Sequence, residues 1–319
     1  MCKILVIPHV KPNKSKELWN FVTTASGFLT KTERHGFGYM ALDDSGNLFG
    51  ERWVSVTDAF RTRDALTESE QKMLESYKGF LNKPSHYNAF GDGNTDAVTS
   101  ICLHARTATN AVNLQNTHPF IDKDSGTALI HNGVVQTNNL ELKTSSCDSE
   151  GILNAYIKEN LGADINNIQS LADKLNGWYA CAAYGKVNGE WYLDVFKDNR
   201  SSLDALFIKE LNILVFCTTA EVVISTCKKL KWTITSHYAI RPDNIIRINP
   251  FDGQVIEVKS FNSEKIVAVS NTALDTLISR YDSSSENNLI ACEDYWNTAC
   301  SDPDELNAAV LYDIKNWKK

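Results

Sequence analysis

The sequence has 319 residues, of which 43% are hydrophobic and 22% are charged, with a formal net charge of −7. This composition is that of a globular protein, and the length allows one large domain or two small ones. The acidic balance and the scattered lysines argue against a nucleic-acid partner bound through phosphate contacts. No stretch reaches the roughly 18 apolar residues of a membrane span, and the first residues lack a signal-peptide pattern. We therefore expect a cytoplasmic protein with no membrane partner.

The eight cysteines are spread along the chain without a CxxC pair. This spacing predicts reduced thiols, mostly buried, rather than a disulfide framework or a zinc site. Cys2 is chemically distinctive, because methionine aminopeptidases remove Met1 when the second residue is small. The new N-terminus would carry an α-amino group with a pKa of roughly 7.7–8.0 beside a thiol of roughly 8.5. One residue would then hold a nucleophile and its base.

The first hundred residues predict strands and helices in turn. Lys3–Ile7 is an apolar run typical of a buried strand, and residues 11–31 predict a short helix. Residues 37–42 and 48–56 predict two strands of a hairpin joined by the turn DDSGN, and a helix is expected over Glu68–Leu81. The loop GDGNTD at 91–96 resembles the start of a calcium loop, but it lacks the later glycine and glutamate, so no metal is expected there.

Polar residues follow two of the next predicted strands. HARTATN comes at the end of a strand over Ala97–His104, and HNG comes after a strand at Thr127–His131. Polar residues grouped at strand ends are typical of a site on the rim of a sheet. TSSCDSE then precedes a helix predicted from Glu150 to Asn160, with Ser146 or Asp148 as its N-cap.

The second half of the chain predicts mainly strands, with a helix at Thr219–Lys229. The expected strands are Trp178–Tyr184, Glu190–Lys197, Ala205–Lys209, Asn212–Thr218, Trp232–Tyr238, Asn244–Ile248 and Gln254–Val258. Many strands with inserted helices favour an α+β layered fold. Residues 2–260 are predicted to form one domain. Residues 261–319 are predicted to be a short, partly helical C-terminal extension, with a helix after Asp302-Pro303.

Five short pieces, taken in order, resemble one known family. They are Cys2, GFGYMAL at 36–42, HARTAT with NTHPF between 104 and 120, LIHNGVV at 129–135, and CDSE at 147–150. Together they resemble the class II glutamine amidotransferase domains of the N-terminal-nucleophile hydrolases, from Cys2 to about residue 230. The resemblance implies a four-layer αββα sandwich of two packed, largely antiparallel sheets, with no cofactor and no metal.

The resemblance also implies a set of catalytic residues. Cys2 would attack the side-chain amide of glutamine and form a thioester, while its amine relays a proton to the departing ammonia. The Asn132 side-chain amide and the Gly133 backbone N–H would form the oxyanion hole, where losing one donor typically costs about 100–1,000-fold in rate. The alternative interpretation of Asn132-Gly133 is a turn between strands.

Four residues would bind the substrate. Arg106 would hold the α-carboxylate with its planar fork of donors, and Asp148 would receive the α-ammonium group. The alternatives are a surface ion pair for Arg106 and a helix N-cap for Asp148. Thr107 and Thr109 are weaker candidates for lining the pocket, because the family often has an aromatic residue where Thr107 stands. Gly36 and His118 are expected to be structural.

The leading hypothesis is a glutaminase that hydrolyses L-glutamine to glutamate and ammonia. Residues 261–319 are too few for the synthase domains that usually consume the ammonia, so we expect an acceptor on a separate protein. One alternative keeps the nucleophile but changes the substrate to another amide. The other is a non-catalytic interaction protein that retains the fold.

Overall fold

The computed structural model describes residues 2–33, 35–54, 68–82, 98–109 and 111–263. Their strands are β1 Lys3–Ile7, β2 Gly36–Asp43, β3 Leu48–Val54, β4 Val98–Arg106, β5 Phe120–Asp122, β6 Thr127–Val135, β7 Gly177–Val187, β8 Glu190–Lys197, β9 Asp204–Ile208, β10 Ile213–Cys217, β11 Ile234–Ala239, β12 Asn244–Ile248 and β13 Val255–Ser260. The helices are α1 Ser15–Thr32, α3 Glu68–Asn82, α5 Asp148–Lys158, α6 Ile168–Ala172 and α7 Ala220–Leu230, with single 3-10 turns at Pro12–Lys14, Thr137–Asn139 and Ile165–Asn167.

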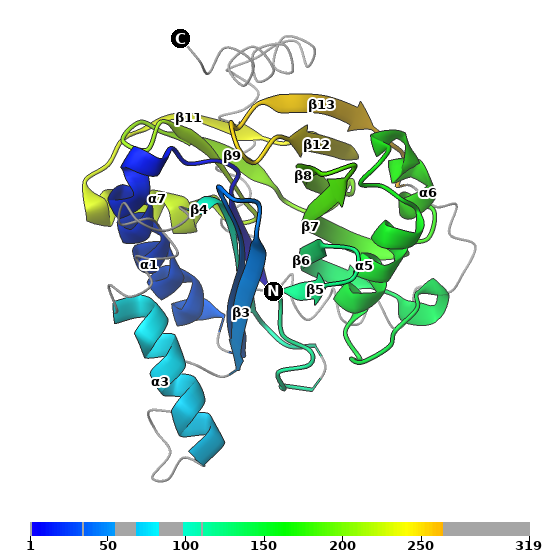
Figure 1. The fold of residues 1–319 in the computed structure, drawn as a ribbon, viewed down its shortest axis with the longest axis horizontal. Helices are drawn as coiled ribbons and strands as arrows, with labels where there is room; N and C mark the ends of the chain where they lie inside the picture. The colour runs from blue at the N-terminus through cyan, green and yellow to red at the C-terminus, as the bar shows by residue number, and fades with distance from the viewer. Residues whose placement is uncertain (1, 34, 55–67, 83–97, 110, 264–319) are drawn as a thin grey trace, which may run out of the picture. The chain divides into compact units, whose positions relative to one another are not determined.

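The strands form two sheets that pack face to face. The seven-stranded sheet has the order β11-β9-β10-β1-β4-β2-β3, and the six-stranded sheet has the order β13-β12-β8-β7-β6-β5. Every pairing is antiparallel, and β1 lies between β4 and β10. Helices α1 and α7 cover the outer face of the first sheet, whereas α5 and α6 cover the outer face of the second (Figure 1). The predicted four-layer αββα sandwich is therefore confirmed.

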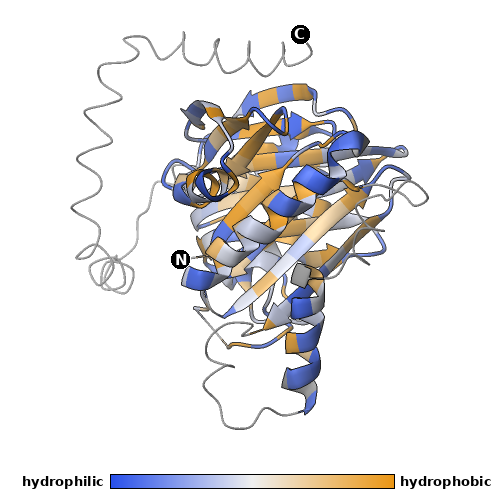
Figure 2. Cartoon of the chain, turned by 90° about the vertical axis from the view of Figure 1, so that its left-hand side faces the viewer, coloured by the Kyte–Doolittle hydropathy of each residue, from blue (hydrophilic) through white to orange (hydrophobic). Residues whose placement is uncertain are grey.

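The amphipathic helices explain the outer layers. In α1 the buried residues Leu18, Trp19, Val22, Ala25 and Leu29 recur at helical spacing and bury one face against the sheet. Figure 2 shows the resulting pattern, in which the strands are mainly hydrophobic and the helices carry many hydrophilic residues. The apolar stripe was readable in the sequence, but the helix is longer than the short helix expected there.

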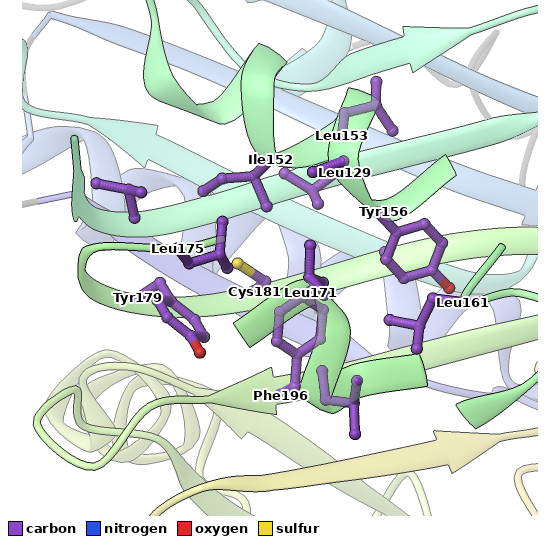
Figure 3. Close-up of a cluster of buried hydrophobic side chains, with 14 of the residues drawn as sticks. Leu129, Ile152, Leu153, Tyr156, Leu161, Leu171, Leu175, Tyr179, Cys181 and Phe196 are labelled. Atoms are coloured by element: carbon purple, nitrogen blue, oxygen red, sulfur yellow. The ribbon is translucent and has the colours of Figure 1, made fainter. Parts of the chain in front are cut away.

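A hydrophobic core lies between α5, α6 and the six-stranded sheet. Figure 3 shows its main side chains, which are Leu129, Ile152, Leu153, Tyr156, Leu161, Leu171, Leu175, Tyr179, Cys181 and Phe196. Each buried side chain of this size contributes about 1.5–3 kcal/mol through removal of apolar area from water. The core holds α5 against β6 and β7, and this placement fixes the N-terminal end of α5 near the polar residues of β6.

The two strands that carry HART and HNG extend further than the sequence predicts. β4 continues to Arg106 because that residue pairs with Gly36 of β2, and β6 continues to Val135, which pairs with Gly177 of β7. His104 and Arg106 of HART and all three residues of HNG are therefore within strands, whereas Thr107 directly follows β4. The sequence prediction ended these strands at His104 and His131, although ladder pairing does not require apolar side chains.

The start of α5 also differs from the prediction. The N-cap position is Cys147, whose side chain makes no capping hydrogen bond, and Asp148 is the first helical residue. The predicted N-caps, Ser146 and Asp148, are therefore wrong. β5 and α6 were not predicted, because a three-residue strand and a five-residue helix leave little periodicity in a sequence.

Several predictions fall outside the described residues. These are the loop at 91–96, the helix after Asp302-Pro303 and nearly all of the C-terminal extension, of which only residues 261–263 are described. Among the described helices, none is both long and apolar enough to cross a bilayer. The described cysteines other than Cys2, at positions 102, 147, 181, 217 and 227, are buried free thiols.

Candidate active site

The pairing of β1 with β4 places Cys2 beside the end of β4. Lys3 lies opposite Ala105 in the ladder, so Cys2 is next to Arg106 and Thr107. The Cys2 thiol donates to the Thr107 carbonyl oxygen, with 3.4 Å between sulfur and oxygen. Burial raises the pKa of the Cys2 thiol to about 11. The thiol is therefore protonated near neutral pH and needs a base before it can act as a nucleophile.

The two threonines predicted to line a pocket lie in the segment after β4. The Thr107 hydroxyl donates to the Glu33 carboxylate, which also forms an ion pair with Lys3 at 3.3 Å. Thr109 is exposed. Thr107 thus faces Glu33, at the C-terminal end of α1, and contributes its carbonyl oxygen rather than its hydroxyl to the surroundings of Cys2.

Arg106 lies buried at the end of β4, with 2% of its surface exposed. Both terminal guanidinium nitrogens donate to the Ala111 carbonyl oxygen at 3.2 Å. Burial lowers the pKa of Arg106, and the nearby Cys147, Cys2 and Asp148 oppose that shift. Arg106 is therefore not a surface residue, and it lies within electrostatic range of both Cys2 and Asp148.

Asn132 and Gly133 lie inside β6, paired with Ala180 and Tyr179 of β7. The alternative interpretation as a turn between strands is therefore wrong. Gly133 has φ of +152°, and a Cβ at this position would lie 2.1 Å from the Trp178 carbonyl oxygen. Only glycine fits so close an approach of backbone to backbone. Gly133 thus adopts a backbone conformation that a side chain would prevent, and this conformation sets the direction of its N–H.

Asp148 connects the first turn of α5 to β6. Its Oδ2 accepts a hydrogen bond from the Val135 backbone N–H at 2.7 Å, and 17% of its side chain is exposed. The preceding loop is organised around Glu150, whose carboxylate accepts hydrogen bonds from the backbone N–H groups of Lys143, Thr144 and Ser145 and from the hydroxyls of Thr144 and Ser145. Burial opposes the shift, but the hydrogen bonds from Thr144 and Ser145 hold the pKa of Glu150 below its ordinary value.

Three buried histidines lie beneath these residues. The rings of His104 and His118 have centroids 3.8 Å apart, and His104 Nε2 donates to the His131 carbonyl oxygen at 3.0 Å. His118 Nε2 and His131 Nδ1 lie 2.7 Å and 3.0 Å from the Ser149 hydroxyl oxygen. In the part of the chain that the structure describes, no group of three or more His, Cys, Asp or Glu side chains is arranged to hold a metal ion. The histidines therefore form a hydrogen-bonded polar layer between the sheets and α5.

Because the three histidines are buried, we predict that acid destabilises the fold. Burial lowers the pKa of His104 to about 3 and lowers those of His118 and His131. Below the unfolded pKa of about 6.5 the unfolded chain binds protons that the folded chain does not, so the stability is complete above that pH and lost as the pH falls. Below that pH, His104 adds up to about 1.4 kcal/mol per pH unit to this loss, because its pKa of about 3 keeps the folded imidazole neutral.

The check is the free energy of unfolding from urea titrations between about pH 7 and pH 5. His104→Gln should remove about 1 kcal/mol per pH unit, averaged over this range, from the wild-type slope, because the unfolded imidazole takes up its proton only as the pH falls through about 6.5. His237→Asn is the control, because that side chain is 37% exposed in a surface pair with Asp204. A slope that His104→Gln leaves unchanged would contradict a buried neutral imidazole at position 104.

The structure thus gathers the predicted residues on or beside four elements. Cys2 directly precedes β1, β4 carries Arg106, β6 carries Asn132 and Gly133, and α5 begins at Asp148. Sequence reasoning assigned no role to Ser149, His131 or Glu33. The histidines had a visible signal, because HART, NTHPF and HNG each contain one, whereas nothing in the sequence distinguished Glu33.

No protein-family model and no curated protein matches this sequence. Among solved structures, the chain is similar to glutamine phosphoribosylpyrophosphate amidotransferase from B. subtilis, with a TM-score of 0.50 and 15% sequence identity over 84% of this chain. The chain has the fold of a class II glutamine amidotransferase domain. A glutamine aminotransferase class-II domain protein from Silicibacter pomeroyi is a further match, with a TM-score of 0.42 and 11% identity over 82% of this chain and all of that one.

The matched region is only part of the B. subtilis enzyme. The chain covers 50% of the B. subtilis enzyme's length. At 15% identity the likeness establishes the fold, whereas activity has to be argued from the residues of the site.

Proposed function

We propose that this protein is a glutaminase that hydrolyses L-glutamine to glutamate and ammonia through a thioester on Cys2. The observation that carries the proposal is that Arg106 lies near both Cys2 and Asp148. Asp148 in turn contacts the strand that contains Asn132 and Gly133. A nucleophile, a pair of oxyanion donors and two opposite charges are the groups that hydrolysis of an α-amino acid amide requires.

Removal of Met1 precedes the reaction and frees the α-amino group of Cys2. That amine takes the thiol proton as sulfur attacks the side-chain carbonyl carbon of glutamine, and the tetrahedral oxyanion forms against Asn132 Nδ2 and Gly133 N–H. The C–N bond then breaks, and the amine returns the proton to the leaving ammonia. Water hydrolyses the thioester and releases glutamate. The raised pKa of the Cys2 thiol supports a role for the amine, because the thiol does not ionise by itself near neutral pH.

The proposed substrate contacts come from Arg106 and Asp148. The guanidinium would bind the α-carboxylate by exchanging the Ala111 carbonyl oxygen, which it now contacts, for a charged acceptor. Asp148 would use the oxygen that Val135 does not occupy to accept from the α-ammonium group. Asn132 Oδ1 is buried without a hydrogen-bond partner among the described residues, and such an unsatisfied group is typical of functional positions.

The ammonia acceptor belongs to a separate protein in this proposal. The chain covers 50% of the length of the B. subtilis amidotransferase. Release of free ammonia in the absence of a partner is therefore the activity to measure first.

The test combines labelling and turnover. Exposure to an electrophile that mimics glutamine should give one adduct by intact-mass analysis, on a chain that has lost Met1. Glutamate release should occur with L-glutamine and fall at least roughly 100-fold with glutamine blocked at its α-carboxylate or at its α-amine, because each block removes a charged contact.

Other outcomes would contradict the proposal. Cleavage of a different amide with no glutamine turnover would identify an amidohydrolase of another specificity. Absence of both adduct and turnover would identify a non-catalytic protein.

A further inference from the structure

The Ser149 hydroxyl lies where two parts of the proposed site meet. Ser149 is the second residue of α5 and is 1% exposed. It directly follows Asp148, and its oxygen lies 3.0 Å from Nδ1 of His131, the residue directly before Asn132 and Gly133. One buried hydroxyl therefore adjoins both the proposed ammonium site and the proposed oxyanion hole.

α5 contacts β6 at two points that lie on either side of Asn132 and Gly133. On one side, the Val135 N–H donates to Asp148 Oδ2 at 2.7 Å. On the other side, the ring of His131 is hydrogen-bonded to Ser149. A segment held at both ends cannot move relative to the helix without leaving a buried polar group unpaired, which is costly.

The surroundings assign a direction to these hydrogen bonds. A hydroxyl has one proton, and the Ser149 oxygen lies 2.7 Å from His118 Nε2, 3.0 Å from His131 Nδ1 and 3.4 Å from Asp148 Oδ1, so Ser149 donates to one of these three atoms. His131 Nε2 and the Trp178 carbonyl oxygen both lie within 2.7 Å of the Cβ position at Gly133, and Nε2 makes no hydrogen bond among the described residues. A carbonyl only accepts, which favours the proton on Nε2. His131 Nδ1 then accepts from Ser149, and His118 Nε2 donates to Ser149.

We propose that Ser149 is a positioning residue for glutamine hydrolysis, because its hydrogen bond to His131 holds Asn132 and Gly133 in register with Asp148. The inference rests on the proposed glutaminase function. Oxyanion donors stabilise a transition state only when they are fixed at the position of the developing charge. A loss of Ser149 would let the His131 ring turn beneath Gly133, and the donor pair would then shift relative to the substrate groups that Asp148 orients.

The first experiment compares the turnover of Ser149→Ala, Ser149→Thr and wild type. Ser149→Ala should lower kcat about 10- to 100-fold, a part of the loss expected on removing one oxyanion donor. Ser149→Thr keeps the hydroxyl and should restore kcat to within about threefold of wild type. Thr226→Ala is the matched control, because its hydroxyl is also buried and hydrogen-bonded, to the Val222 carbonyl oxygen on α7.

The second experiment measures the ring-nitrogen NMR signals of His118 and His131. Wild type should show the proton of both rings on Nε2, and Ser149→Ala should shift the His131 Nδ1 signal while Thr226→Ala leaves it unchanged. Equal losses of kcat in Ser149→Ala and Thr226→Ala, or an unchanged His131 signal, would overturn the inference. If wild type does not hydrolyse glutamine at all, the proposed function fails, and the NMR comparison alone decides whether Ser149 fixes the His131 ring.

Discussion

Cys2→Ala is expected to reduce glutamine hydrolysis by roughly 10⁴-fold or more, because removing the nucleophile of a covalent mechanism removes the whole reaction path. Alanine is as suitable as cysteine for Met1 removal, so the variant changes the thiol and leaves the free α-amine in place. Glutamate release, followed with a coupled assay at saturating L-glutamine, measures the loss. Cys227→Ala controls for loss of a buried cysteine, since Cys227 lies on α7 and outside the proposed site.

A second variant separates the thiol from the amine. A chain with an uncleavable N-terminal extension keeps the Cys2 thiol but converts its amine to an amide, which is not a base. Burial holds the Cys2 pKa at about 11. The extended chain should therefore also lose activity at neutral pH, with partial recovery as the pH rises towards the thiol pKa. Full activity in the extended chain would refute the terminal amine as the base, and full activity in Cys2→Ala would refute the thioester.

The fold was predictable mainly where the sequence has periodicity or turn chemistry. Lys3–Ile7 is an apolar run, and the turn after Asp43 is closed by hydrogen bonds from Asn47 to the Asp43 carboxylate. The apolar stripe of α1 gave the helix, although not its full length. The arrangement of two sheets in four layers came from the family resemblance, because no local pattern states which strands pair across long stretches of chain.

The sequence suggests candidate site residues, but it does not predict the contacts between them. A sequence can suggest Asp148, but its hydrogen bond to Val135 depends on how α5 docks on β6. The sequence also could not distinguish a turn from a strand at Asn132-Gly133, because that dipeptide is common in hairpin turns. The β7 partner decides the matter, since Gly133 must lie against the Trp178 carbonyl oxygen.

The same argument applies to Ser149 and to the histidines. Each is an ordinary polar residue in the sequence, and each becomes informative only when burial removes water as a partner. His104 and His118 come from segments on opposite sides of the 107–117 connection, yet their rings are in contact. The histidines of HART, NTHPF and HNG are thus a better guide to a buried network than to a substrate contact.

Asp194→Ala is expected to lower the free energy of unfolding by about 3–5 kcal/mol, because it leaves the buried Arg247 without its charge partner. Arg247 Nε and a terminal nitrogen each donate to one Asp194 oxygen at 2.7 Å, and Tyr156 donates to the same carboxylate at 2.6 Å. Asp194 is fully buried, so water does not replace the lost bonds. Urea titration monitored by circular dichroism measures the change.

The double variant Asp194→Ala, Arg247→Met tests whether the unpaired charge causes that loss. Removing both charges leaves no buried ion, so the double variant should be more stable than Asp194→Ala by at least about 1 kcal/mol. Tyr156 belongs to α5, the helix that begins at Asp148, and Arg247 also donates to the Leu161 carbonyl oxygen just beyond that helix. Weakening this contact should therefore raise the KM for glutamine in Asp194→Ala, even where the protein stays folded. If the double variant were as unstable as the sum of the two single variants, the loss would come from packing and not from the unpaired guanidinium.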